Sequence, residues 1–411
     1  MSGLFRNFLP WLAVAPCSLA QNMHDAAFSV IFRHVWWKWK WYGQVAGRAL
    51  ICRILERDLK LSVQTNYRDV ETEIVPVLVE ALAQFPMLRE FDWDKSLGSM
   101  PLVVLQTLLS ANEQLEKLRI QTGSPVDLSG FSNLVNLEVY DCDSESPDTG
   151  TPQIRCPDSL QSLNLYLYSY NRATLAALVE NTLSLRVLRL VGPCIRWDLV
   201  RHISSYTFLH TISLIEITPP LDTGLDFTHL PTLANLTLHT IRDIQNCGSL
   251  PICIRTPHIL RNFKLTQVWP AVLETSVLGG VDIASLDSMS LRGVTLTQGD
   301  MDSIFAPQFS ESTGPPAHGP CMLKALELHY LNPSLLVAAL RSSRPFPALL
   351  HLCVSFADTD LLDSLPSFLA QVNTLQRLEL ESICHYMQDG EGSFFPWPPS
   401  FLLAFRNAQN L

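Results

Sequence analysis

The chain has 411 residues, and its 47% hydrophobic content excludes an intrinsically disordered protein. Its 39 acidic and 29 basic residues give a formal net charge of −10, which argues against nonspecific binding to a nucleic-acid backbone. No stretch reaches the ~18 uninterrupted apolar residues of a membrane span, so we expect no nucleic-acid partner and no membrane span.

The first 48 residues differ in character from the rest of the chain. Residues 1–21 place Arg6 before an apolar run that ends in a small residue, as in a signal peptide. An apolar segment that packs on the first repeat would have the same pattern. Residues 32–42 contain four tryptophans within six positions, which suits a cap over the end of a repeat array, a membrane-interface belt or an anchor for a partner. We favour an irregular, aromatic-rich cap for residues 1–48.

From residue 85 onward the chain repeats the pattern L-x-x-L-x-L, in which the fixed positions are leucine or another apolar residue. Twelve segments show it, and their first leucines are 24 to 27 residues apart except for one step of 19 and one of 37. This period and pattern indicate a leucine-rich-repeat solenoid. The segments begin at Leu88, Leu115, Leu134, Leu160, Leu185, Leu209, Leu233, Leu260, Leu286, Leu323, Leu349 and Leu375.

Helical patterns precede several of these segments. Residues 70–84 carry apolar residues at helical spacing, and Phe85-Pro86 ends that helix because the residue before proline avoids helical dihedrals. Residues 49–63 form a degenerate first repeat. We therefore expect residues 49–411 to form an α/β solenoid of about 12–13 irregular repeats, a horseshoe with parallel strands on the concave face and helices on the convex face. The other predicted helices cover residues 102–109, 175–179, 335–340 and 361–369.

Two stretches interrupt the period. A run rich in proline, glycine and serine over residues 305–320 predicts a loop, and residues 143–157 predict a shorter, acidic loop. Near the end, residues 401–405 resemble a helix, and a thirteenth repeat strand would begin at Leu411. Either the molecule is truncated there or the last helix covers the end of the array.

Motifs for catalysis are missing. The sequence lacks the glycine-rich phosphate and dinucleotide signatures, the G-x-S-x-G nucleophile motif and the H-E-x-x-H zinc motif. Aspartates in D-x-D pairs are expected to be solvated residues or helix N-caps, not metal ligands. We therefore expect no enzymatic activity, no catalytic residue, no cofactor and no metal. The D-x-D pairs are Asp92 with Asp94, Asp141 with Asp143, and Asp358 with Asp360.

The ten cysteines are scattered, and none forms a C-x-x-C pair. Secreted leucine-rich-repeat proteins usually cap the array with clustered disulfides, and this chain has no such cluster. Reduced, buried thiols in the cytoplasm or nucleus fit this distribution. Secretion is the alternative, because of residues 1–21.

The repeat pattern also predicts which side chains face outward. Side chains alternate along a strand, so positions 4 and 6 point into the core and positions 3, 5 and 7 face the concavity. Over the whole array the outward residues form a mixed polar surface. Tyr140 and Tyr166 would lie on adjacent strands beside Arg189, and Tyr and Arg are enriched at interface hot spots. Together with Lys117 and Arg119 they are our candidate partner-binding residues; an ordinary solvated face is the alternative.

The irregular repeat length, the F-P-x-L-x-x-L and L-x-x-L-x-L strands and the intervening helices resemble the fungal F-box and leucine-rich-repeat proteins over residues 49–411. The resemblance implies an N-terminal F-box that binds the Skp-type adaptor of a cullin ubiquitin ligase, and repeats that bind the substrate. Here Leu9-Pro10 is followed by Trp11-Leu12, and residues 28–34 only faintly resemble the family's apolar helix. The F-box is thus absent or degenerate, and no functional residue carries over.

Two hypotheses follow. The first is non-enzymatic protein–protein recognition by the solenoid, as an F-box-like substrate receptor of a Skp–cullin ubiquitin ligase. The second is a secreted or surface leucine-rich-repeat protein that binds an extracellular ligand.

Overall fold

The computed structural model describes the repeat strands and part of their connections. The predicted cap 1–48, the predicted helices at 175–179 and 401–405, and the start of a thirteenth strand at Leu411 lie outside the described residues. The described ranges are 58–61, 75–83, 88–93, 98–122, 126–141, 154–166, 184–196, 203, 206–218, 225–241, 254–268, 276–305, 322–342, 346–356 and 359–382.

The chain forms two compact units, Met1–Ile120 and Gln121–Leu411. In the first unit the strands are parallel and in phase, with Glu90 opposite both Asp58 and Lys117. Helices α4 and α5 confirm the two helices predicted from the sequence; α5 buries Val104, Leu105 and Leu108. The elements are β1 (Asp58–Leu61), α4 (Val75–Ala83), β2 (Glu90–Trp93), α5 (Leu102–Ala111) and β3 (Lys117–Thr122).

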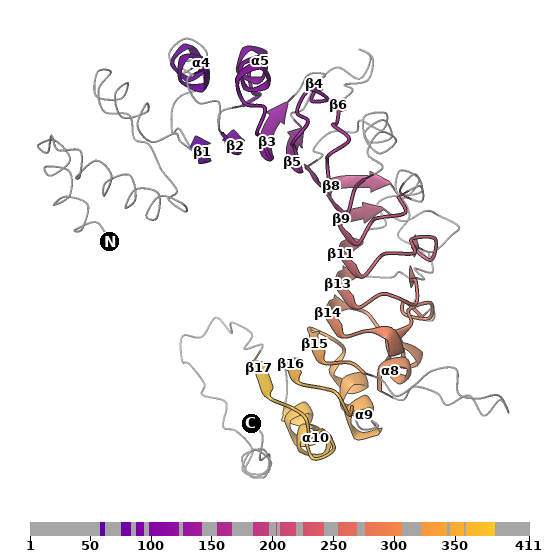
Figure 1. Cartoon of the computed structure of the whole chain (residues 1–411). Coiled ribbons are helices and arrows are strands. Elements are labelled where there is room, and N and C mark those ends of the chain that lie inside the picture. Colours follow the sequence, from indigo (N-terminus) through magenta and orange to yellow (C-terminus); the bar gives the residue numbers. More distant parts are fainter. Residues whose placement is uncertain are drawn as a thin grey trace, which may run out of the picture. The chain divides into compact units, whose positions relative to one another are not determined.

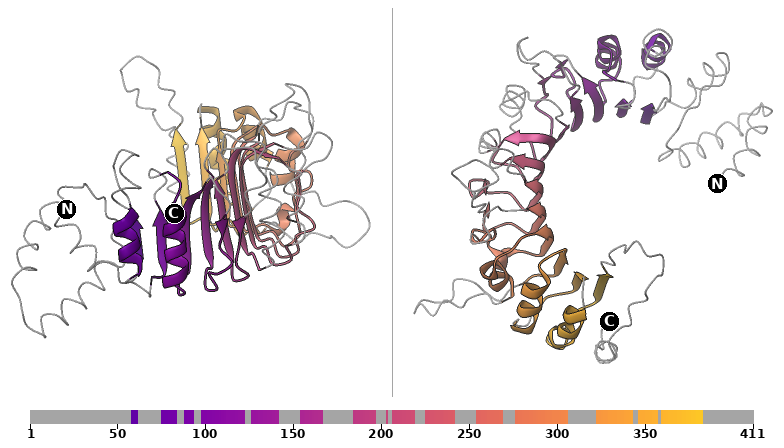
Figure 2. Two further views of the ribbon diagram at one scale, coloured as in Figure 1. Left: turned by 90° about the horizontal axis from the view of Figure 1, so that it is seen from above. Right: turned by 180° about the vertical axis from the view of Figure 1, so that it is seen from behind.

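The second unit is built on a parallel sheet in which neighbouring strands follow each other along the chain (Figures 1 and 2). The strands pair in phase: Tyr140 is opposite Tyr166, and Tyr166 is opposite Val191. The strands are β5 (Asn136–Asp141), β7 (Ser162–Tyr166), β8 (Val187–Arg196), β9 (Thr211–Thr218), β11 (Asn235–Ile241), β13 (Asn262–Val268), β14 (Ser288–Val294), β15 (Ala325–His329), β16 (His351–Phe356) and β17 (Arg377–Ser382).

The leucines of the repeat form the core, as the alternation predicts. In β7 burial alternates residue by residue, with Leu163 and Leu165 buried and their neighbours half-exposed. The first leucine of each pattern is buried as well, for example Leu185 at 0% exposure. Each buried leucine contributes about 1.5–3 kcal/mol of hydrophobic free energy. Parallel strands in register, packed on repeated leucines, establish the leucine-rich-repeat solenoid.

Helices cover the sheet near the end of the second unit. α8 (Gln298–Phe305), α9 (Pro333–Ser342) and α10 (Thr359–Leu369) lie on the core side, and α9 and α10 confirm two predicted helices. Phe305, Phe346 and Phe368 meet edge to face with ring centroids 5.8–6.2 Å apart. The expected loop 305–320 therefore begins one residue too early, because Phe305 is the buried last residue of α8.

In other connections of the second unit the described residues form short strands and turns instead of helices. β4 (Val126–Asp127) pairs with β6 (Ile154–Arg155), and β10 (Leu225–Asp226) pairs with β12 (Ile254–Arg255). β6 lies within the expected loop 143–157, whose residues 143–153 are outside the described part.

The sequence D-x-[S/T] explains why the chain turns after β4 and after β10 and forms no helix at these two points. The carboxylate of Asp226 accepts hydrogen bonds from the backbone N–H (2.9 Å) and hydroxyl (2.6 Å) of Thr228. Asp127 makes the same pair of bonds with Ser129, at 3.0 and 2.6 Å. Such side chain–backbone bonds compete with helical hydrogen bonds. A 3₁₀ turn, η6 (Ile283–Ser285), precedes β14.

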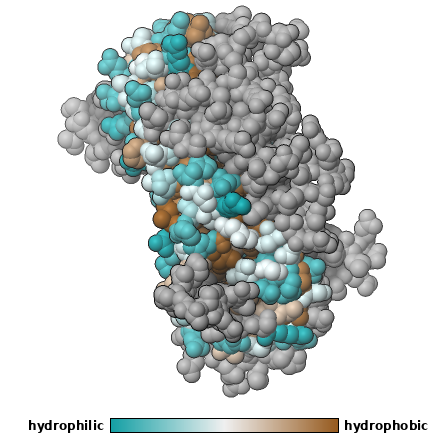
Figure 3. Space-filling view, turned by 90° about the vertical axis from the view of Figure 1, so that its right-hand side faces the viewer, coloured by the Kyte–Doolittle hydropathy of each residue, from teal (hydrophilic) through white to brown (hydrophobic). Residues whose placement is uncertain are grey.

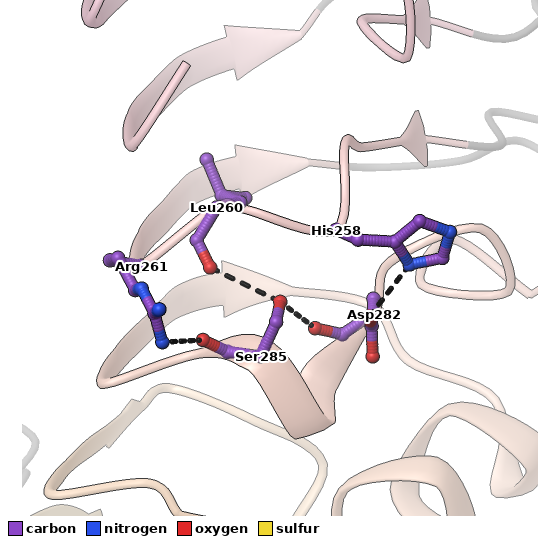
Figure 4. Close-up of polar contacts among 5 residues, drawn as sticks. All are labelled: His258, Leu260, Arg261, Asp282 and Ser285. Atoms are coloured by element: carbon purple, nitrogen blue, oxygen red, sulfur yellow. Dashed lines mark hydrogen bonds and ion pairs between the residues drawn. The ribbon is translucent and has the colours of Figure 1, made fainter. Parts of the chain in front are cut away.

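A hydroxyl bridge joins several neighbouring repeats. A serine or threonine directly before the first leucine donates a hydrogen bond to the carbonyl of the first leucine one repeat earlier. Figure 4 shows this for Ser285, whose hydroxyl lies 3.1 Å from the Leu260 carbonyl oxygen and 2.8 Å from that of Asp282. Beside it Arg261 donates to the Ser285 carbonyl at 3.3 Å, and His258 Nδ1 lies 2.8 Å from Asp282 Oδ2. The other bridges join Ser159 to Leu134, Ser184 to Leu160, Thr232 to Leu209 and Thr374 to Leu349.

Asp300 fastens α8 to the preceding repeat. Thr297 caps the helix and exchanges hydrogen bonds with Asp300: its hydroxyl accepts from the Asp300 N–H at 3.1 Å, and its N–H donates to Asp300 Oδ2 at 2.9 Å. The other oxygen, Oδ1, accepts from the hydroxyl of Ser276 (2.6 Å) and the N–H of Leu278 (2.8 Å). Asp300 is fully buried at 0% exposure, and its charge is satisfied by these donors.

On the side of the molecule seen in Figure 3, the described surface is mostly polar and contains apolar patches. Teal and white atoms cover most of its described surface, and brown atoms lie between them. Among the described helices none has the length and apolar character that crossing a bilayer requires.

Candidate interaction surface

Within each unit the outward side chains of the sheet form a surface, which we call the outer sheet face and define as positions 3, 5 and 7 of each repeat strand. In β5 and β7 these positions are half-exposed, while positions 4 and 6 are buried. The strand register places equal positions of successive repeats next to each other, about 4.8 Å apart. Side chains from distant parts of the chain therefore form rows across the strands.

In the first unit the candidate residues Lys117 and Arg119 form ion pairs with the preceding strand. Lys117 Nζ contacts Glu90 Oε1, and Arg119 donates to Asp92 Oδ2 at 3.1 Å. Both pairs are at least partly exposed, so each contributes about 0–1 kcal/mol. Asp92 belongs to one of the D-x-D pairs, and its carboxylate contacts a cation of the protein itself. In the described part of the chain, histidines, cysteines and carboxylates form no cluster suited to a metal ion.

The other three candidate residues lie together in the second unit. The rings of Tyr140 and Tyr166 stack with centroids 4.3 Å apart and an interplanar angle of 14°. The guanidinium carbon of Arg189 lies 5.9 Å from the centroid of the Tyr166 ring, within the range of a cation–π interaction. The Tyr140 hydroxyl donates to Glu138 Oε1 at 2.6 Å. We call Tyr140, Tyr166 and Arg189 the tyrosine–arginine cluster.

The register of three strands explains this cluster. Tyr140 and Tyr166 occupy position 7 of β5 and β7, and Arg189 occupies position 5 of β8. The buried leucines beneath hold the strands, so both tyrosines are fixed side by side before any partner arrives. The sequence predicted that the three residues are neighbours; their role in binding stays a prediction.

At the other end of the outer sheet face a histidine, a serine and a glutamate meet, a group that the repeat pattern did not single out. His329 Nδ1 lies 2.7 Å from Ser355 Oγ and 3.1 Å from Glu381 Oε2, and Ser355 donates to Glu381 at 2.8 Å. These hydrogen bonds lower the pKa of Glu381, and the Ser355 hydroxyl is the largest cause.

This geometry differs from that of a catalytic triad. In a triad the serine binds one imidazole nitrogen while the carboxylate orients the other. Here the same nitrogen, Nδ1 of His329, contacts both groups, and the serine hydroxyl donates directly to the glutamate. Ser355 is also buried at 5% exposure, which restricts access of a substrate to the hydroxyl. The group is a hydrogen-bonded row across β15, β16 and β17.

The neighbouring row of the same strands is also paired internally. Arg377 contacts Glu379, and His351 Nε2 lies 3.8 Å from the other carboxylate oxygen of Glu379. Burial raises the pKa of the Cys353 thiol to about 11, and the surrounding carboxylates of Glu379 and Glu327 add to the effect. Cys353 is therefore an inert thiol at neutral pH.

No protein-family model and no curated protein matches the sequence. The structure is similar to the crystal structure of the leucine-rich repeat-containing protein LegL7 from Legionella pneumophila, at 12% identity and a TM-score of 0.32, with 85% of this chain and 96% of that chain covered. The assignment as a leucine-rich-repeat solenoid rests on the strand register and the buried leucines.

Proposed function

We propose that the protein is a non-enzymatic recognition solenoid that binds a protein partner through its outer sheet face, centred on the tyrosine–arginine cluster. The stacked pair of Tyr140 and Tyr166 beside Arg189 carries this proposal. Aromatic and arginine side chains contribute most of the free energy at many protein interfaces. The two tyrosines stack on adjacent strands, so ordering these side chains on binding costs little entropy.

A substitution experiment tests the proposal. Tagged full-length protein is compared with the variant Tyr140→Ala/Tyr166→Ala/Arg189→Ala in affinity purification with quantitative mass spectrometry. The control, Arg155→Ala/Arg186→Ala/Phe208→Ala, removes two exposed arginines and an exposed aromatic that lie outside positions 3, 5 and 7.

We expect the cluster variant to lose its specific partners by at least about tenfold, since hot-spot truncations cost about 2 kcal/mol or more each. The control should retain them. Full retention by the cluster variant, with folding verified by circular dichroism, contradicts the proposal.

The identity of the partner is a finer proposal. The resemblance of residues 49–411 to F-box and leucine-rich-repeat proteins supports a substrate receptor of a Skp–cullin ubiquitin ligase, with segment 1–48 contacting the adaptor. Among the described cysteines, the free and buried thiols Cys156 and Cys353 support a location in the cytoplasm or nucleus. Purification with the intact N-terminus, scored for adaptor and cullin subunits, tests this; their absence removes the ligase hypothesis and leaves the recognition hypothesis in place.

The alternative is a secreted or surface protein that binds an extracellular ligand, and the signal-like pattern of residues 1–21 favours it. N-terminal mass spectrometry of the protein from its native source separates the two hypotheses. A mature chain that begins at Gln21 supports secretion, whereas an intact N-terminus contradicts it.

A further inference from the structure

The charges on the outer sheet face are unevenly distributed. From β7 to β14, positions 3, 5 and 7 contain three cations, Arg189, Lys264 and Arg292, and no carboxylate. The carboxylates of this face belong to the strands on either side, for example Glu138 in β5 and Glu327 in β15. The sequence predicts a mixed polar surface over the whole array, but between β7 and β14 the charged residues of this face are all cations. We call the three cations the cationic band; they stand out in a chain whose net charge is −10.

The cations at the ends of the sheet differ from the cationic band. Lys117, Arg119 and Arg377 contact carboxylates of their own or the neighbouring strand. Within the band, Arg189 has Asn164 and Ser213 as its register neighbours. Lys264 likewise lies between Thr237 and Ser290. These neutral neighbours leave positive charge on the surface for a ligand to neutralise.

The guanidinium of Arg292 packs on the ring of Tyr330, a residue with left-handed backbone dihedrals. The guanidinium carbon lies 5.3 Å from the centroid of the Tyr330 ring, and Tyr330 has a φ of 54° directly after β15. Carboxylates also lie near the band: Glu216 follows position 7 of β9, and the charge of Arg292 contributes to the lowered pKa of Glu381 in β17. The charge of Glu216 acts on His239, whose pKa is lowered mainly by burial.

An apolar row adjoins the cationic band. Position 7 is Tyr140 in β5, Tyr166 in β7, Val191 in β8 and Ile215 in β9, and these residues are mutual register partners. Three strand spacings separate the first from the last, about 14 Å. The row ends at His239 of β11, and Lys264 and Arg292 follow on the next two strands. The face thus changes from apolar to cationic along one direction across the strands, and Arg189 of the band lies beside the apolar row.

From this arrangement we infer that the partner contributes an extended acidic segment that lies across strands β5 to β14, with a hydrophobic side chain on the apolar row and carboxylates on the cationic band. The inference rests on the proposed function and specifies its ligand. The six strand spacings from β5 to β14 cover about 29 Å, which an extended peptide of about nine residues spans. Charge complementarity selects the acidic segment.

A polypeptide suits this face better than a nucleic acid. Three cations are few for a phosphate backbone, and the chain as a whole, at net −10, repels a polyanion of high charge density. The apolar row also favours contact with hydrophobic side chains, which an acidic peptide can carry between its carboxylates.

Binding of simple polymers to the full-length protein tests the inference. The probe is a fluorescent random copolymer of glutamate and tyrosine; the comparison probes are polyglutamate, a lysine–tyrosine copolymer and single-stranded DNA. The band variant is Arg189→Gln/Lys264→Gln/Arg292→Gln. The control Arg155→Gln/Arg186→Gln/Arg255→Gln removes the same charge from exposed arginines outside the outer sheet face. A single variant, Lys264→Gln, exposed and far from the core, keeps the test valid if the triple variant misfolds.

We expect the wild type to bind the glutamate–tyrosine copolymer more tightly than polyglutamate or DNA, and the lysine–tyrosine copolymer not at all. The band variant should bind at least about tenfold more weakly because three exposed ion pairs are lost, and the single variant about twofold more weakly. The control should stay within twofold of the wild type.

Equal losses in the band and control variants, no binding by the wild type, or equal affinity for all polyanions overturns the inference. These outcomes differ from failure of the proposed function. If a partner is lost on substitution of the tyrosine–arginine cluster but binds through a neutral or basic segment, the proposed function stands and only the acidic ligand is wrong.

Discussion

Replacing Asp300 should lower the stability of the repeat array more than replacing any exposed residue nearby. Its buried carboxylate accepts hydrogen bonds from two backbone N–H groups and two hydroxyls, which belong to Ser276, Leu278 and Thr297. Asp300→Ala leaves two backbone donors without an acceptor, at about 1–3 kcal/mol each, and removes the capping box, worth about 1 kcal/mol. We therefore expect a loss of about 3–7 kcal/mol in the free energy of unfolding. Asp300→Asn should cost roughly 2 kcal/mol, because its NH₂ group faces donors.

Urea unfolding followed by circular dichroism measures this loss, and hydrogen exchange locates it. Protection should fall first at residues 276–278 and 297–305, since each repeat depends on its neighbours. The control is Asp302→Ala on the same helix, whose side chain is half-exposed and accepts one hydrogen bond, from Gln298 at 2.8 Å. It should change stability by about 0.5 kcal/mol or less. If both alanine variants lose the same stability, the bridging role of Asp300 is wrong.

Three further predictions concern other described residues. The side-chain amide of Asn112 is buried without a hydrogen-bond partner, so Asn112→Leu should raise the midpoint of thermal unfolding, and a lower midpoint would show that the site is filled by water. Burial raises the pKa of Cys156 to about 12, so Cys156 and Cys353 should resist iodoacetamide at pH 8 until the protein is unfolded, as peptide mass spectrometry can test; rapid labelling of the native protein contradicts this. Hydrogen bonds from Ser129, its hydroxyl first, lower the pKa of Asp127 below its ordinary 3.8, so the stability they add is present above that pH and is lost as pH falls through the folded-state pKa. The difference in melting temperature between wild type and Ser129→Ala should therefore be constant from pH 7 to pH 5 and shrink in acid; a difference that grows in acid would refute the linkage.

Much of this architecture follows from sequence periodicity alone. The pattern L-x-x-L-x-L determines which side chains are buried, because strand geometry alternates and the repeats pair in phase. The neighbourhood of Tyr140, Tyr166 and Arg189 follows from the same rule, since equal positions of successive repeats lie in one row. A strand register is thus enough to predict contacts between residues about 25 apart in the chain.

The remaining features cannot be predicted from the repeat period. The two-residue strands β4 and β10 depend on local turns at Asp127 and Asp226, whose D-x-[S/T] sequences are a usable signal only once turn chemistry is considered. The T-x-x-D spacing of Thr297 and Asp300 likewise marks the start of α8. The row of His329, Ser355 and Glu381 depends on side-chain rotamers, which a repeat pattern leaves open.

The register between β14 and β15 has a consequence for how such arrays diversify and how they can be engineered. The longest step between repeats, 37 residues, separates their first leucines, yet Ser288 is opposite Ala325, as equal positions are in the neighbouring steps. The extra length of this step therefore leaves the register of the two strands unchanged. That connection is a natural place to insert an epitope or a reporter domain, because the outer sheet face would keep its rows while the chain gained a handle for imaging or capture.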